Sequence, residues 1–123
     1  MPLPVPHAEA GIASVTRRPA DRRTVVALHG ELDLHTVARL EPRLLPLLEN
    51  SSGGLVLDLA AVTFCDSAGA DLFRRLNEHC AADAAVVLQG IPRQPSRVIR
   101  LMGLDRSLHC EFGRTPPSAA QQN

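Results

Sequence analysis

The sequence has few aromatic side chains, with three phenylalanines and no tryptophan or tyrosine among its 123 residues. Proteins that bind single-stranded nucleic acid stack the bases on aromatic rings, so this scarcity argues against such a surface. Lysine is absent as well: all thirteen basic side chains are arginines, thirteen acidic ones balance them, and no region forms a like-charge block. We therefore expect neither nucleic acid nor an anionic membrane as a partner.

Long hydrophobic runs are also missing. No segment has the roughly 18 consecutive apolar residues that a transmembrane helix needs. The first six residues contain three prolines and lack the apolar stretch of a signal peptide. We expect a protein without membrane insertion that stays in the cytoplasm.

The three cysteines, Cys65, Cys80 and Cys110, are far apart, and no C-x-x-C pair occurs. This spacing suggests neither a zinc ribbon nor a redox dithiol. We interpret the cysteines as small buried apolar side chains in a reducing compartment. No cofactor or metal is expected.

Size and composition indicate one globular unit. Apolar residues make up 45% of the chain and charged residues 21%, which is typical of a soluble domain. A chain of this length supports one hydrophobic core. We expect a loose lead-in over residues 1–10, a folded domain over 11–112 and a polar, disordered tail over 113–123.

Apolar runs and helical spacings alternate along the chain. Glycine, proline and asparagine separate five short runs that predict strands, at 12–18, 24–28, 55–59, 84–88 and 108–112. Apolar residues at helical spacing predict helices over 36–48, 67–80 and 95–103. The phenylalanines and methionines are interpreted as core residues. In the first helix Pro42 and Pro46 lie opposite the apolar stripe and should face solvent.

This order predicts an α/β fold: a mostly parallel central sheet of four to five strands with an antiparallel edge strand, packed by about three helices. In such sheets functional groups gather beyond the carboxyl ends of the strands. Asp33 and Asp66-Ser67 both follow strands, so we expect them at the same edge. Asp58 is interpreted as a structural acid at the end of its strand, bonded to nearby backbone.

Ser67 has two interpretations from its position alone. A serine at the start of a helix is either a plain N-cap or an acceptor for a phosphate, which the helix N-terminus can hold. Asp33 is interpreted as the cap of the first helix, with Thr36 as the alternative. Alternation of His29, Glu31, Asp33 and His35 would also allow a metal site if one strand continued through all four. No G-x-S-x-G or phosphate loop supports an enzyme.

Three segments occur in a telling order: Gly30-Glu31-Leu32-Asp33, the strand ending in Asp58-Leu59, and Val62-Thr63-Phe64-Cys65-Asp66-Ser67-Ala68-Gly69. In this order and spacing, from about Ile12 to Phe112, the sequence resembles the STAS domain of anti-sigma factor antagonists. The resemblance implies a regulator, not an enzyme. It binds a kinase-type (GHKL) anti-sigma factor and so frees a sigma factor.

The resemblance also implies the site and its control. Ser67 matches the serine that the partner kinase phosphorylates with ATP, which switches the antagonist off until a PP2C-like phosphatase restores it. The partner-binding residues it implies are Asp33, Asp66, Ser67, Ala68, Gly69 and Asp71. A monomer or weak dimer is expected. The alternative is a STAS subunit of a lipid-transport complex of the ABC type, with Ser67 unmodified.

Three departures from the family pattern concern the site and the end of the domain. Ala68 stands where many members have a second hydroxyl residue, which leaves Ser67 as the acceptor. Ala70-Asp71 replaces the common Leu-Gly, which changes the surface of the first helical turns and with it the choice of partner. The polar tail takes the place of the usual C-terminal helix.

Overall fold

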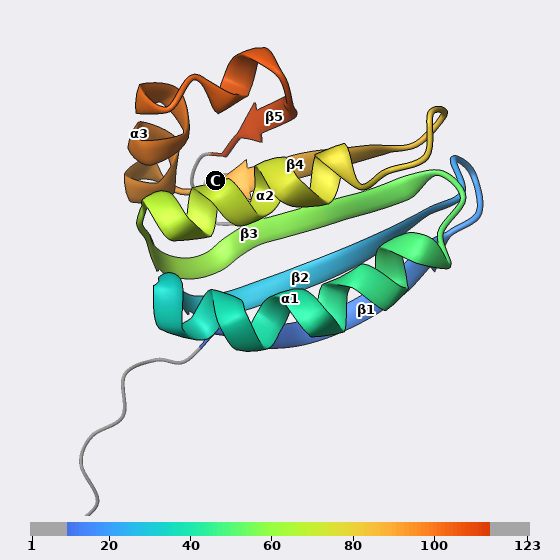
Figure 1. Cartoon of the computed structure of the whole chain (residues 1–123), viewed down its shortest axis with the longest axis horizontal. Helices are drawn as coiled ribbons and strands as arrows, with labels where there is room; N and C mark the ends of the chain where they lie inside the picture. Colours follow the sequence, from blue (N-terminus) through green and yellow to red (C-terminus); the bar gives the residue numbers. More distant parts are fainter. Residues whose placement is uncertain (1–9, 114–123) are drawn as a thin grey trace, which may run out of the picture.

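Five strands form one mixed sheet in the order β1-β2-β3-β4-β5 (Figure 1). The structure is a computed structural model that describes residues 10–113. The antiparallel pair at one edge is β1 (Gly11–Arg18) with β2 (Arg23–Leu32). The other three strands are parallel to β2 and to one another: β3 (Gly54–Cys65), β4 (Ala85–Ile91) and β5 (His109–Phe112).

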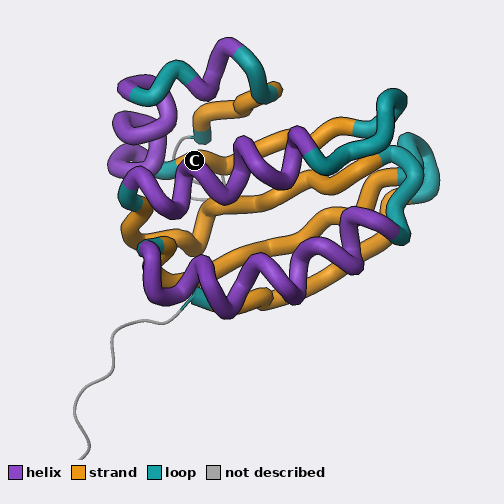
Figure 2. The backbone as a smooth tube through the Cα atoms, viewed as in Figure 1, coloured by secondary structure: helices purple, strands orange, loops and turns teal. Residues whose placement is uncertain are grey.

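The longer helices cover one face of this sheet. α1 (Leu34–Glu49) and α2 (Ser67–Glu78) lie side by side across it, while α3 (Arg93–Leu101) stands at the end where β3 finishes (Figures 1 and 2). A short 3₁₀ helix, η1 (Leu104–Arg106), leads into β5. The predicted fold class is confirmed, and none of the described helices is long and apolar enough to cross a membrane.

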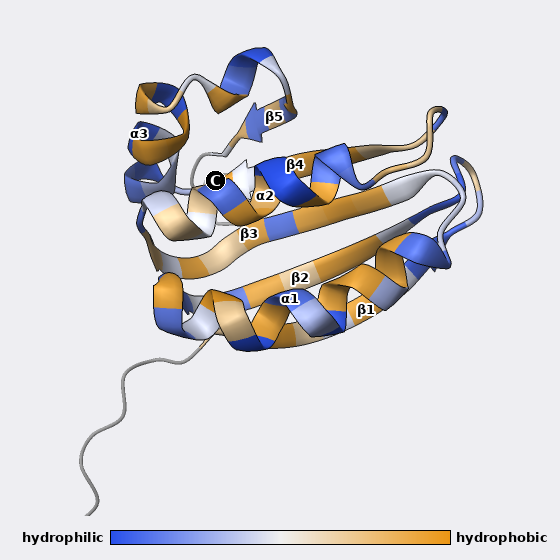
Figure 3. Cartoon of the chain, in the orientation of Figure 1, coloured by the Kyte–Doolittle hydropathy of each residue, from blue (hydrophilic) through white to orange (hydrophobic). Residues whose placement is uncertain are grey.

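The core lies between the sheet and the two helices. Figure 3 shows β2 and β3 apolar over much of their length, and hydrophilic residues recurring along the helices. Leu28 of β2, Leu57 of β3 and Phe73 of α2 are fully buried there. Each such side chain contributes about 1.5–3 kcal/mol on burial, so this layer supplies most of the stability.

Three strands run well past their predicted ends, among them β4, which ends at Ile91 instead of Leu88. The strand expected to end near Gly30 continues to Leu32, because Gly30 takes a φ of 91° and a register shift follows it. The strand predicted over 55–59 continues through residues 60–65, which form the second half of β3 and pair with β2 as far as Cys65. β4 pairs with β3 only as far as Asp58, so the second half of β3 does not pair with β4. Its sequence therefore lacks the continuous apolar character of a central strand.

Smaller corrections concern helix starts and exposed side chains. α1 begins two residues before the predicted Thr36, and α3 begins at Arg93 instead of Pro95. Phe64 and Met102 were predicted in the core, but 40% and 39% of their surface is exposed.

Other local predictions hold. Pro42 and Pro46 lie on the exposed side of α1 as predicted. Asp58 accepts a hydrogen bond from the Ala60 backbone N–H at 3.0 Å, although it stands within β3 rather than at its end. The lead-in and tail lie outside the described residues, apart from Ala10 and Gly113.

All three cysteines are free. Cys65 is buried, and the other two are partly buried. Burial raises the pKa of the Cys65 thiol to about 12 and that of Cys110 to about 11. The thiols are therefore protonated at neutral pH. Cys65 packs as a small buried apolar side chain as predicted, whereas Cys80 and Cys110 are buried only in part.

Candidate functional site

Two helices start side by side at one edge of the sheet. Leu32, the last residue of β2, pairs with Cys65, the last residue of β3. The Asp66 backbone N–H then donates to the Leu32 carbonyl at 3.1 Å, which holds the two chain segments together one step further. Asp33 and Asp66 follow directly, so the predicted meeting of these acids at one sheet edge is confirmed.

Each aspartate is the N-cap of its helix. The Asp33 carboxylate accepts from the Thr36 backbone N–H at 2.9 Å, and the Thr36 hydroxyl interacts with the Asp33 backbone N–H at 3.0 Å. The hydrogen bond that the carboxylate accepts from the Thr36 backbone N–H is the chief reason why the pKa of the Asp33 carboxyl lies below its ordinary value. Asp33 and its alternative Thr36 thus form one capping box, the reciprocal arrangement that closes a helix start.

Ser67 is not a cap. The cap of α2 is Asp66, whose carboxylate accepts from the Gly69 backbone N–H at 3.0 Å. Ser67 is the first residue inside the helix and is exposed, and its hydroxyl makes no hydrogen bond to any residue between 10 and 113. The hydroxyl is therefore open to another protein, and no described side chain activates it as a nucleophile.

Gly69 lets α2 approach the ends of the strands. A Cβ atom on Gly69 would come within 2.6 Å of the Leu32 carbonyl oxygen and 2.9 Å of the Cys65 sulfur. Any larger residue would push the start of α2 away from β2 and β3. Gly69 is buried, so its part in this site is to set the position of Ser67, while Ala68 beside it is half-buried.

Gln94 at the start of α3 holds the end of β3 from the other side. Its side-chain amide donates to the Cys65 carbonyl and its oxygen accepts from the Cys65 N–H, both at 2.8 Å. Sequence reasoning missed this residue, since a lone glutamine 29 residues away carries no signal for such a contact.

Asp71 lies one helical turn after Ser67. Its carboxylate accepts from Arg74 at 2.7 Å and from Arg75 at 2.5 Å, and the first of these chiefly lowers the pKa of the Asp71 carboxyl. Arg75 also pairs with Glu41 at 2.8 Å and so joins α2 to α1. The charge of Asp71 is thus largely compensated within the chain, and its contact with a partner stays a prediction.

Two large apolar side chains flank the aspartates. Leu34, directly after Asp33, is 76% exposed, and Phe64, directly before Cys65, is 40% exposed. Exposed leucine and phenylalanine beside a polar site are typical of protein–protein contacts. Leu34 was not among the predicted contact residues, because the helix was predicted to begin only at Thr36.

The alternative metal site is not assembled. His29 and Glu31 lie in β2, whereas Asp33 and His35 belong to the start of α1. Between residues 10 and 113 there is no group of three or more histidine, cysteine or acidic side chains placed to hold a metal ion. The aspartates of this edge are used in capping.

Most of the chain matches known sequences of one family. The family model described as "Mlab, STAS domain" matches residues 15–110. Over 92 residues the chain is 30% identical to the anti-sigma-B factor antagonist of Staphylococcus epidermidis, covering 72% of this chain and 82% of that protein. It is 29% identical over 97 residues to that of Staphylococcus aureus, covering 76% and 87%.

Solved structures share the fold. An anti-sigma factor antagonist from Mycobacterium paratuberculosis is similar with a TM-score of 0.75 at 24% identity, covering 93% of each chain. The unphosphorylated form of the anti-sigma factor antagonist SpoIIAA is similar with a TM-score of 0.63 at 21% identity, covering 92% of this chain and 94% of that one. The match over most of the chain, to both the domain model and the curated antagonists, shows that this chain belongs to the STAS-domain family of anti-sigma factor antagonists.

Proposed function

We propose that this protein binds a kinase-type anti-sigma factor, thereby releases a sigma factor, and is switched off when the kinase phosphorylates Ser67. The observation that carries the proposal is the exposed, unbonded Ser67 hydroxyl at the first position of α2, beside two capping aspartates. A kinase can reach such a hydroxyl without unfolding any segment between residues 10 and 113.

The phosphate would affect binding more than folding. It adds about −1.5 to −2 charge at neutral pH. The start of a helix favours an anion by about 0.3–1 kcal/mol, so the domain tolerates the group. In a complex the same group loses its water next to Asp33 and Asp66, and a buried charge without a partner is costly.

The partner surface would combine both helix starts. Leu34, Phe64 and half-buried Ala68 supply the apolar contact, and the capping aspartates with Ser67 supply its polar part. Asp71, with Arg74 and Arg75, extends the surface along α2. In this proposal the chain has no turnover of its own: the kinase supplies ATP chemistry, and a separate PP2C-like phosphatase removes the phosphate.

The test uses the full chain and cell extract from its own source. We expect affinity capture to recover a GHKL-type kinase, and incubation of the recovered kinase with ATP to add one phosphate, located on Ser67 by peptide mass. Ser67→Ala should be captured equally well and stay unmodified. Recovery of a transport permease and its ATPase, with Ser67 unmodified, would instead support the STAS subunit of a transport complex.

A further inference from the structure

The hairpin between β1 and β2 gathers four arginines at one corner of the sheet. Arg17 and Arg18 end β1, Arg22 is the last residue of the four-residue turn, and Arg23 begins β2. Arg18 pairs directly with Arg23 in the strand register. The sequence shows two separate arginine pairs, and only the turn makes them one group, which we call the arginine corner (Arg17, Arg18, Arg22 and Arg23).

One carboxylate in the turn compensates part of this charge. Asp21 pairs with Arg18 at 2.6 Å and reaches Arg23 at 3.5 Å, while the Arg23 Nε donates to the Gly53 carbonyl at 3.2 Å. The guanidinium groups of Arg17 and Arg22 have no hydrogen bond or ion pair within residues 10–113. Four arginines against one aspartate leave a formal charge of +3 on a chain whose net charge is zero.

A shallow hollow lies at this corner. All four arginines line it, together with the loop after α1 that includes Asn50 and Ser52, and none of its described lining residues is acidic. Its volume is about 260 Å³. Pockets that enclose a whole small-molecule ligand measure about 300–1,000 Å³, so this hollow fits a charged group rather than a complete metabolite.

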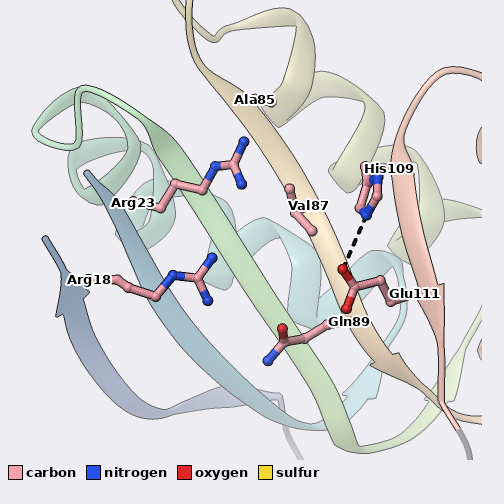
Figure 4. A pocket seen from close by; sticks show the side chains of 7 residues that line it. All are labelled: Arg18, Arg23, Ala85, Val87, Gln89, His109 and Glu111. Carbon is pink, nitrogen blue, oxygen red and sulfur yellow. Dashed lines mark hydrogen bonds and ion pairs between the residues drawn. The ribbon is translucent and has the colours of Figure 1, made fainter. Parts of the chain in front are cut away.

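The neighbouring hollow is less suited to an anion. Figure 4 shows Arg18 and Arg23 side by side over the helix-free face of the sheet, with His109 and Glu111 across from them. His109 and Glu111 interact at 3.1 Å, and the Glu111 carboxylate adds to the attraction on Arg18. An anion therefore finds the positive charge uncompensated at the Arg17 and Arg22 side of the corner.

We propose that the arginine corner binds a phosphate group, carried either by a soluble small molecule or by a lipid headgroup. Guanidinium groups present a planar fork of N–H donors that matches phosphate oxygens in pairs and stays charged at every physiological pH. Ser52 in the adjoining loop offers a further hydroxyl donor at the rim.

This site is remote from Ser67. β2 starts at Arg23 in the corner and ends at Leu32 beside Asp33, and its ten residues span about 30 Å at the usual rise of a strand. Occupation of the corner and phosphorylation of Ser67 therefore use opposite ends of the sheet, and the proposal stands independently of the proposed switch.

The test is titration of the full chain with sodium pyrophosphate at physiological ionic strength, followed by calorimetry. We expect saturable binding that the double variant Arg17→Gln/Arg22→Gln weakens about tenfold or more, because each guanidinium gives charge-assisted hydrogen bonds. The matched control Arg43→Gln/Arg106→Gln removes the same charge from exposed sites elsewhere and should weaken binding less than about twofold.

Vesicles distinguish the two sources of phosphate. The same three proteins are sedimented with vesicles of phosphatidylcholine, with and without phosphatidic acid. Binding to phosphatidic acid that depends on the corner, without binding of pyrophosphate, assigns a lipid headgroup, and the reverse assigns a soluble ligand. Absence of both, or equal weakening in the control variant, overturns the site. Because Arg17 and Arg22 make no described ion pair, all three proteins should melt alike.

Discussion

The helices α1 and α2 begin with the same kind of cap, an aspartate, but the two helix starts serve different purposes. Both begin with an aspartate that accepts from the third helical N–H. In α1 that third residue is Thr36, whose hydroxyl bonds back to the cap and also donates to the Glu31 carbonyl at 2.7 Å. In α2 it is Gly69, which has no side chain to bond.

The first helical residues differ as well. α1 presents the apolar Leu34, and α2 presents the hydroxyl of Ser67. The start of α1 is therefore closed by hydrogen bonds and offers an unreactive contact, whereas the start of α2 is packed tightly and offers a modifiable group. One cap chemistry thus anchors the start of α1 and presents a hydroxyl at the start of α2, depending on the residues that follow the aspartate.

A permanent charge at Ser67 should weaken partner binding more than any other change. Ser67→Asp should weaken binding to the anti-sigma kinase by about 2–5 kcal/mol, since the charge is desolvated without a partner. Ser67→Ala should bind like the wild type. Since Asp66 is the cap, Ser67→Ala should also leave the melting temperature nearly unchanged.

Calorimetry against the purified kinase measures these affinities. Ala82→Asp, which adds the same charge to an exposed loop, serves as the control and should bind normally. Equal affinity of the aspartate and alanine variants of Ser67 would contradict the proposed switch.

The next effect is steric. Gly69→Ala should destabilise the domain by about 1–3 kcal/mol, because the new methyl group overpacks the ends of β2 and β3. Denaturant unfolding measures the loss. The neighbouring Ala68→Ser adds one atom at a half-buried position and should change stability by less than about 0.5 kcal/mol. Similar stability of both variants would show that α2 can shift freely.

Removal of the caps should separate the two helix starts further. Asp33→Ala and Asp66→Ala should each cost about 0.5–2 kcal/mol. Asp33→Ala should cost more, because it also leaves the Thr36 hydroxyl without one of its contacts. Thermal melts of both variants test this order, and a larger loss for Asp66→Ala would refute it.

The smallest changes in stability concern the ion pairs of Asp71 and should depend on pH. The folded-state pKa values of Asp33 and Asp71 are lowered, so their contribution to stability is fully present above the unfolded value and is lost as pH falls through the folded one. Asp71→Asn should cost only about 0–1 kcal/mol, since its ion pairs are partly exposed. Melts from neutral pH down to about 2 should show the difference between Asp71→Asn and wild type shrinking with acid.

Local patterns predicted much of this edge. Aspartate before an apolar helical stripe identified Asp33 as a cap, and two acids after apolar strands predicted their meeting. The sequence offered Ser67 as a possible cap of α2, but the cap is Asp66, one position earlier. Aspartate and serine are both good caps, so the choice between them depends on where β3 ends. That end is fixed by pairing with β2, which a local pattern cannot reveal.

Contacts between residues far apart in the sequence could not be predicted from local patterns. Gln94 meets Cys65 across 29 residues, and the arginine corner exists only once the hairpin closes. Neither the amide nor the two arginine pairs stand out from ordinary surface residues in the sequence.

The Gln94 contact protects the end of β3 against aggregation. The pairing of β3 with β4 ends at Asp58, so the last residues of β3 form a strand edge on that side. An unpaired edge invites the strand of another chain. By bonding both the N–H and the carbonyl of Cys65, the Gln94 amide takes the place of a peptide unit in a neighbouring strand. One side chain thus closes the end of this edge against intermolecular sheet growth.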